Sequence, residues 1–180
     1  INSNLAGGYT NGSTTYKSAS AVAADLAYYH DGKKAGSGWA WGAVLSNLGT
    51  KVSYTDNADA KDFIPANLGL GLNYTKKMNE TNSLSFGVEA NKLLVPTPPG
   101  QNATAQDIAD YRSKSVIGGW FSSFGDAPGG FAEEMKEFQI SAGAEYWYNN
   151  QFALRAGYFY ENKTKGDRRY FTTGLGLKYN

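Results

Sequence analysis

Apolar and polar residues alternate along most of this chain. From Phe138 to Tyr148 the even positions are apolar or small, and the odd positions 139–145 hold Gln, Ser, Gly and Glu. Residues 152–160 repeat the alternation, again with the apolar residues at even positions. Since successive side chains of a β-strand point to opposite faces, both segments are predicted to be strands with one apolar face.

The sequence Asn-Asn-Gln at residues 149–151 separates these two strands and is predicted to close an antiparallel hairpin. A hairpin centred on this loop places Tyr148 opposite Phe152 on the apolar face. Glu145 and Arg155 then face each other on the polar side, where opposite charges stabilise a cross-strand pair.

Five further segments show the same period, which brings the number of predicted strands to seven. They are residues 20–30, 39–47, 66–76, 83–91 and 170–179, of which the first two fit the pattern less cleanly. The connections fall into two classes: short ones at one end of the strands (31–38, 78–82 and 149–151) and mostly long ones at the other (5–18, 48–65, 96–137 and 163–168). Short turns opposite long loops are typical of bacterial outer-membrane barrels.

Aromatic residues gather at the strand ends around the 149–151 turn. In a soluble sandwich the apolar face forms the core, where rings need not gather at strand ends. In an outer-membrane barrel, tyrosine and tryptophan form girdles at the lipid headgroups, because their rings are apolar and their tips are polar. The residues predicted for a membrane girdle are Tyr146, Tyr148, Phe152, Tyr158 and Tyr160.

The polar faces of the predicted strands are rich in Gly, Ser and Asn, which suits a wet or plugged lumen better than a packed core. The sequence therefore predicts an all-β fold, an antiparallel transmembrane β-barrel of the bacterial outer membrane. A soluble β-sandwich or a lipocalin-like binding protein is the alternative, and a requirement for detergent would separate it from the barrel.

Composition excludes several other classes. Mean hydropathy is −0.48, and no stretch approaches the 18 apolar residues of a membrane-spanning helix. The net charge of +1 gives no general attraction to nucleic acid, so no nucleic-acid partner is predicted. Without cysteine the chain has no disulfide, thiolate metal site or cysteine nucleophile.

The longest connection, residues 96–137, is expected to be ordered. Prolines in Val-Pro-Thr-Pro-Pro-Gly (95–100) end the preceding strand. Residues 102–115 carry the spacing of a short helix, and residues 123–137 hold a Gly-Pro turn that leads to a second helical segment. Apolar residues between them favour order: Val116, Ile117, Trp120, Phe121 and Phe124. The segment is expected to fold over the barrel mouth or to meet a partner.

Candidate catalytic chemistry is sparse. His30, the only histidine, stands beside Asp31 and raises the possibility of a Ser-His-Asp lipase, but a histidine beside a turn is usually a turn residue. Residues 56–62 hold three carboxylates but lack the glycine and closing glutamate of a hand-type calcium loop. No catalytic residue, metal ligand or cofactor is therefore predicted. The basic segment 163–169 is either a contact for the phosphates of lipopolysaccharide or a charged hairpin tip.

Several runs of residues resemble the PorV family, which consists of outer-membrane barrels of the type IX secretion system of Bacteroidota and belongs to the FadL-like barrels. The resemblance extends from about Trp39 to the end, is most specific in the last 40 residues and is looser in residues 1–38. The runs are WAWGAVLSNLGTKVSYTDN (39–57), KDFIPANLGLGLNYT (61–75), NKLLVPTPP (91–99), SFGDAPGGF (123–131) and residues 143–180.

Members of this family are expected to have about 14 strands. The resemblance therefore implies that residues 1–180 form one incomplete barrel domain with seven strands, a strand stub at residues 1–5 and a long extracellular loop at 96–137.

The resemblance also implies a non-enzymatic role. The family is expected to bind the C-terminal signal domain of secreted cargo and to shuttle that cargo from the translocon to the surface attachment machinery. The implied partners are cargo C-terminal domains, a translocon barrel (SprA/Sov-like), a sortase-like attachment protein (PorU-like), membrane lipid and lipopolysaccharide.

Binding of this kind requires exposed contacts in the long loops. The expected anchors are rings of the 96–137 loop, unless these rings only pack their own loop: Trp120, Phe121, Phe124 and Phe131. The runner-up function is a FadL-like transporter of hydrophobic compounds, which needs an apolar ligand tunnel.

Overall fold

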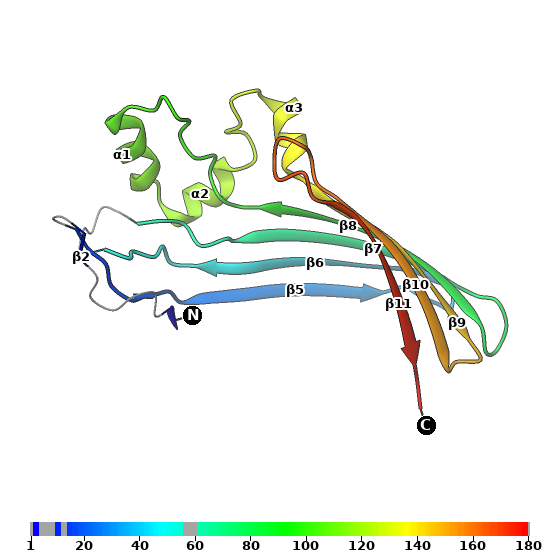
Figure 1. Cartoon of the computed structure of the whole chain (residues 1–180). Coiled ribbons are helices and arrows are strands. Elements are labelled where there is room, and N and C mark those ends of the chain that lie inside the picture. Colours follow the sequence, from blue (N-terminus) through cyan, green and yellow to red (C-terminus); the bar gives the residue numbers. More distant parts are fainter. Residues whose placement is uncertain (1, 4–9, 12–13, 56–60, 180) are drawn as a thin grey trace. The chain divides into compact units, whose positions relative to one another are not determined.

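Seven strands form one sheet in which each strand lies beside its neighbour in sequence (Figure 1). The computed structural model describes residues 2–3, 10–11, 14–55 and 61–179. The sheet order is β11-β10-β9-β8-β7-β6-β5. The strands are β5 (Ala23–Asp31), β6 (Gly38–Gly49), β7 (Asn67–Lys77), β8 (Ser83–Leu93), β9 (Gln139–Tyr148), β10 (Phe152–Tyr160) and β11 (Arg169–Leu177).

The predicted antiparallel all-β fold is confirmed, and the seven predicted strands correspond to β5–β11. The first strand needs a correction, because it begins at Ala23 and not at residue 20. Ala19–Ser20 form a separate short strand, β4, which pairs with β1 (Asn2–Ser3) in a two-stranded sheet. Within the predicted stub at residues 1–5, the described residues Asn2 and Ser3 form this short strand, which lies outside the seven-stranded sheet.

The register of the β9–β10 hairpin follows the prediction. Tyr148 pairs with Phe152, and Glu145 pairs with Arg155. Alternation fixes this register, because a shift by one residue would move every apolar side chain to the other face. A further short pair joins β2 (Thr10–Asn11) to β3 (Thr14–Thr15).

The 94–138 connection contains three short α-helices and one 3₁₀ turn: α1 (Ala105–Ser113), α2 (Val116–Ser122), α3 (Phe131–Glu134) and η1 (Met135–Glu137). Helix α1 begins at Thr104, whose hydroxyl accepts from the Asp107 backbone while the Asp107 carboxylate accepts from Thr104. The helices predicted within 102–115 and 123–137 are thus confirmed. Helix α2 was predicted only as an ordered apolar segment, because its two glycines weaken the helical pattern.

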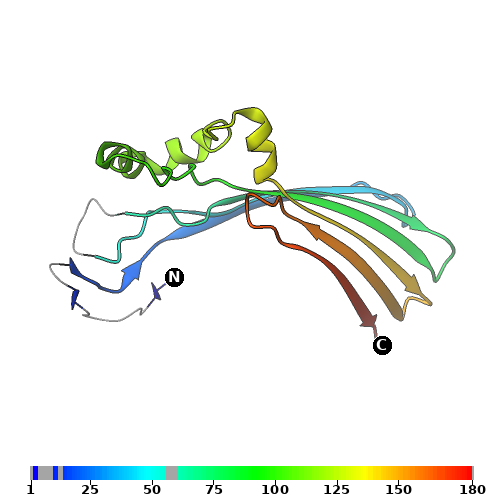
Figure 2. The same ribbon diagram turned by 45° about the horizontal axis from the view of Figure 1, so that its top comes forward.

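The chain divides into two compact units that share the long strands. Unit 1 contains Ile1–Asp25, Leu45–Asn67 and Leu93–Glu134, and unit 2 contains Leu26–Val44, Leu68–Lys92 and Met135–Asn180. Unit 1 thus holds the three helices, and unit 2 holds the turns 78–82 and 149–151 together with β9–β11. In unit 2 the strands β7 to β11 run side by side in sequence order (Figure 2).

The described residues form only a small apolar core. Their buried apolar side chains are five alanines, Leu94 and Pro96. Large apolar residues on the apolar faces of the strands are exposed instead, among them Leu70, Leu72, Phe86, Val88, Leu154 and Leu175. The apolar faces predicted from the alternation are therefore not covered by other parts of the described chain. No helix among the described residues is long and apolar enough to cross a membrane.

Candidate functional site

The polar face of unit 2 forms an open hollow of about 900 Å³. Residues from five strands, β7 to β11, share its wall with parts of β5 and β6. Glycines and small polar residues predominate on the β7–β11 part: Gly69, Gly71, Asn73, Thr75, Ser85, Gly87, Ser141, Gly143, Gly157 and Thr172. The polar face predicted from the odd positions of β9 and β10 thus lines this hollow.

Three glycines lie directly across neighbouring strands in the hollow. Gly87 pairs with Gly143, and Gly143 pairs with Gly157. A Cβ at Gly157 would lie 2.8 Å from the Thr172 hydroxyl, so this position on β10 has no room for a side chain unless its neighbour moves.

The predicted Glu145–Arg155 pair also lies in the wall of the hollow. The Nε of Arg155 donates to Oε2 of Glu145 at 2.5 Å, and the Nε1 of Trp147 donates to Oε1 at 2.7 Å. One carboxylate thus joins two neighbouring strands, and both of its oxygens have a donor. The ion pair makes this part of the hollow unfavourable for an apolar ligand.

The residues predicted for the membrane girdle lie on the opposite, exposed face. Tyr148 and Phe152 are half exposed, at 52% and 53%, at the turn end of β9 and β10. Tyr158 and Tyr160 lie at the other end of β10, where the Tyr158 ring packs on Phe171 with centroids 4.7 Å apart. Tyr146 is intermediate in burial.

Further rings extend this aromatic cluster onto β5–β7. The Tyr28 and Trp41 centroids lie 5.0 Å apart, and the Trp39 and Tyr74 centroids lie 4.9 Å apart. The sequence pattern identified the alternation of these residues, but they were not among the residues predicted for a girdle. Their position just before or after a short turn is the signal that identifies them.

Lys51 holds the C-terminal end of helix α1 in unit 1. Its ammonium donates to the backbone carbonyls of Arg112 and Lys114 at 2.8 and 2.6 Å. It also lies 4.0 Å from the centroid of the Phe63 ring, which packs edge-on against Tyr111. Cations are favourable at the C-terminal end of a helix, where backbone carbonyls lack partners. Burial lowers the pKa of Lys51, with a further contribution from Lys61.

Helix α2 packs closely onto the start of the connection. Gly119 is buried, and a side chain there would meet Phe63 and Pro96. Asp126 accepts from both the backbone and the hydroxyl of Thr97, which joins the two ends of the segment 97–126. These contacts show that the 96–137 segment is ordered, as predicted from its apolar residues.

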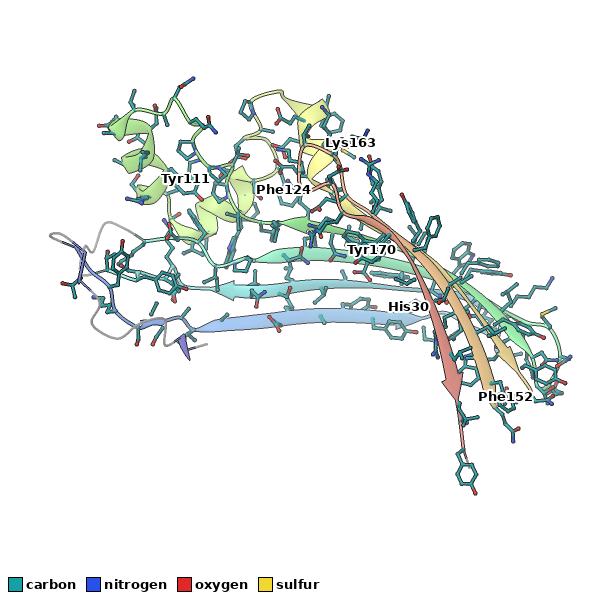
Figure 3. All side chains as sticks on the ribbon, in the orientation of Figure 1. His30, Tyr111, Phe124, Phe152, Lys163 and Tyr170 are labelled. Carbon is teal, nitrogen blue, oxygen red and sulfur yellow. The ribbon has the colours of Figure 1, made fainter. Side chains whose placement is uncertain are left out.

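The four expected partner-binding residues differ in exposure. Phe121 and Phe131 are 75% and 78% exposed, and Phe124 is 47% exposed (Figure 3). Trp120 is of intermediate burial. Two further apolar side chains, Ile117 and Met135, are also exposed. Ile117 and Phe121 are four residues apart in α2 and therefore share one helical face.

The loop between β10 and β11, residues 161–168 in unit 2, closes around a buried carboxylate. The side chain of Glu161 is 4% exposed and accepts from Arg168 Nε and Nη2 at 2.7 and 2.9 Å and from Gln139 at 3.0 Å. The hydrogen bonds from Arg168, and also the one from Gln139, lower the pKa of Glu161 despite its burial.

A second ion cluster ties β8 to the same loop. Glu137 in η1 accepts from Lys92 at 2.5 Å and from Lys165 at 2.8 Å, and the Lys92 side chain is only 1% exposed. Burial alone would raise the pKa of Glu137, but hydrogen bonds from Lys165 and Lys92 outweigh it and lower the pKa. Sequence reasoning missed this cluster, because its members are far apart in the chain.

The other candidate chemistry from the sequence has little structural support. His30 lies near the end of β5 with its ring centroid 6.0 Å from that of Trp41. Residues 56–60 of the carboxylate-rich segment lie outside the described residues, and Asp62 pairs through its backbone with Val52. Across the described residues, no group of three or more His, Cys, Asp or Glu is placed to hold a metal ion.

The fold and the site define an all-β protein with an exposed apolar sheet face, a hollow of mixed polar and apolar lining and a folded helical loop. The family model described as "Type IX secretion system protein PorV" matches residues 3–100, which is more than half of the chain. The chain therefore belongs to the PorV family and is a component of the type IX secretion system. The match includes residues 3–38, where the resemblance had been looser. A search of curated proteins finds no match.

Proposed function

We propose that this chain lies in the bacterial outer membrane as part of a β-barrel, with the apolar faces of its strands toward lipid. The observation that supports this placement is the exposure of large apolar side chains along β7–β11 on the face opposite the hollow. A water-soluble protein would leave this face in contact with water, and contiguous apolar surfaces of such size are rare on soluble monomers.

The spacing of the aromatic residues agrees with this placement. Phe152 and Tyr160 stand at the two ends of β10. Eight residues of strand span about 27 Å, which at a tilt of about 40° gives roughly 20 Å along the membrane normal. The apolar band of an outer-membrane barrel is about 25 Å tall between its girdles. The separation of the rings is thus within about 5 Å of the height of that band, which supports their assignment to its two boundaries.

The proposed role is non-enzymatic transfer of secreted cargo. The chain binds the C-terminal signal domain of the cargo as it leaves the translocon barrel and passes it to the sortase-like attachment protein. The family assignment and the exposed rings of a folded helical loop support this role. Protein interfaces are anchored by a few aromatic side chains, and the proposed anchors are Phe121, Phe124 and Phe131, with Trp120 as a half-buried neighbour.

The hollow disfavours the runner-up function. A transporter of hydrophobic compounds needs an apolar tunnel, whereas this hollow has a mixed lining in which the Glu145–Arg155 ion pair interrupts the apolar surface.

Detergent dependence tests the membrane placement. The intact protein should require detergent to remain monodisperse in size-exclusion chromatography, because its apolar face must be covered. Monodisperse behaviour without detergent would show that the placement is wrong.

Cargo binding is tested with an isolated type IX C-terminal signal domain and the intact protein in detergent. Replacing Phe121 and Phe131 together by alanine should weaken binding by about thirtyfold or more, since a single anchor residue already contributes about 2 kcal/mol or more. Ile108→Ala on α1 is the matched control, because Ile108 is also exposed but lies outside the proposed anchors. Equal affinity of the double variant and the unaltered protein would refute the assigned anchors.

A further inference from the structure

The 161–168 loop has a well-defined conformation and carries several basic side chains. Glu161 is buried under Arg168, and Gly166 (φ +140°) passes so close to this carboxylate that a side chain there would collide with it. Asp167 adopts the left-handed region at φ +54°, and Asn162 caps the turn through hydrogen bonds to Thr164. A loop of this kind loses little conformational entropy when it binds a ligand.

Cations outnumber carboxylates in this loop. Residues 161–169 contain Lys163, Lys165, Arg168 and Arg169 against Glu161 and Asp167. Glu161 is engaged by Arg168, and Glu137 is shared between Lys165 and Lys92. Lys163 is exposed in the loop (Figure 3). The loop and its surroundings therefore retain an excess of positive charge.

Arg169 stands at the border between this charge and the apolar face. It is the first residue of β11 and pairs with Tyr160 in the sheet register. Its guanidinium carbon lies 5.5 Å from the centroid of the Tyr160 ring, and its Nη2 donates to Asp167 at 2.5 Å. Phe171 follows on the same face at 84% exposure, and Leu175 at 83%. A cation, a tyrosine and a strip of exposed apolar side chains thus follow one another along β10 and β11.

We propose that this border binds the phosphate of an outer-leaflet glycolipid of the lipid A type, with acyl chains along the exposed face of β10 and β11. Arg169 and Lys163 supply charge-assisted hydrogen bonds to the phosphate, and Tyr160 lies at the level of the headgroup. A soluble anion would use only the cations, whereas a lipid also covers Phe171 and Leu175. The inference rests on the proposed membrane placement and goes beyond the cargo role.

Native mass spectrometry of the intact protein in detergent, titrated with bisphosphorylated lipid A, tests this site. The double variant Arg169→Gln with Lys163→Gln should bind roughly tenfold more weakly, because each basic residue near a lipid headgroup contributes to binding. The control is Lys33→Gln with Lys34→Gln, which removes two charges from the turn at the other end of the strands. Unchanged affinity of the double variant, or an equal loss in the control, would overturn the site.

A variant that gains affinity for lipid A gives a second test, because a misfolded protein would lose affinity and not gain it. Asp167→Asn removes the carboxylate that competes for Arg169, and asparagine tolerates the left-handed backbone. This variant should bind lipid A about threefold more tightly, and weaker or equal binding would contradict the inference. Displacement of the lipid by millimolar inorganic phosphate would show a soluble-anion site instead. Failure of the membrane placement would appear separately, as a protein that stays monodisperse without detergent.

Discussion

Substitution of one residue on the exposed face of β10 by arginine tests whether that face contacts lipid or water. Ala156 is exposed, faces the same side as Phe152 and Tyr160, and lies four residues from each. It is therefore about 13 Å along the strand, or roughly 10 Å along the membrane normal, from both proposed boundaries. Its sheet neighbour on β9 is Ala144, which leaves an added side chain no large neighbour there. Ala156→Arg should destabilise the protein by about 2–4 kcal/mol, the cost of arginine at the middle of a bilayer.

Denaturant titration of the intact protein in phospholipid vesicles, followed by tryptophan fluorescence, measures this change. If the face were in water, the substitution would change the unfolding free energy by no more than about 0.5 kcal/mol. Ala109→Arg on α1 is the matched control, because Ala109 is exposed in a helix and arginine is a good helix former. A change at Ala156 as small as that at Ala109 would refute the lipid-facing orientation.

Three further predictions concern the loops and the hollow. The lowered pKa of Glu161 means that its ion pair stabilises the β10–β11 loop fully above the ordinary glutamate pKa of about 4.3, and that this stabilisation is lost as pH falls below that value. Glu161→Gln should mimic acid at neutral pH, giving faster hydrogen exchange in the loop, and unchanged exchange would contradict the clamp. Lys51→Met should reduce the local stability of α1 by about 1.5–3 kcal/mol in hydrogen exchange, whereas the exposed control Lys61→Met should not. Gly157→Val should cost about 1–3 kcal/mol in unfolding titrations through contact with Thr172, and failure of Thr172→Ala to restore part of the loss would exclude this contact.

The strands and the hairpin register could be predicted from the sequence because both are local properties. Period-two alternation places each strand within a few residues, and a three-residue turn fixes which residues of β9 and β10 face each other. The Glu145–Arg155 pair follows directly from that register. The start of β5 was misplaced because the pairing of Ala19–Ser20 with Asn2–Ser3 depends on a contact that no local pattern shows.

The contacts that shape the long loops could not be predicted from local patterns. Lys51 bonds to residues more than 60 positions away, and Lys92 bonds to Glu137 across 45 positions. In the sequence each of these lysines is an ordinary charge beside a strand. The rings of the 96–137 loop could be predicted as candidate partner-binding residues, because the sequence shows which residues are aromatic. Their exposure could not be predicted, because it depends on which side of α2 packs against Phe63.

The unequal lengths of the connections also determine the order in which the strands pair during folding. Closing the three-residue turn between β9 and β10 confines little chain, whereas joining β8 to β9 confines about 45 residues and costs roughly 2 kcal/mol more in entropy. The β9–β10 hairpin should therefore form early, and the β8–β9 edge should meet late in folding. Until then, the apolar face and a free edge of β9 are exposed together, which makes this junction the part of the folding chain most prone to aggregation.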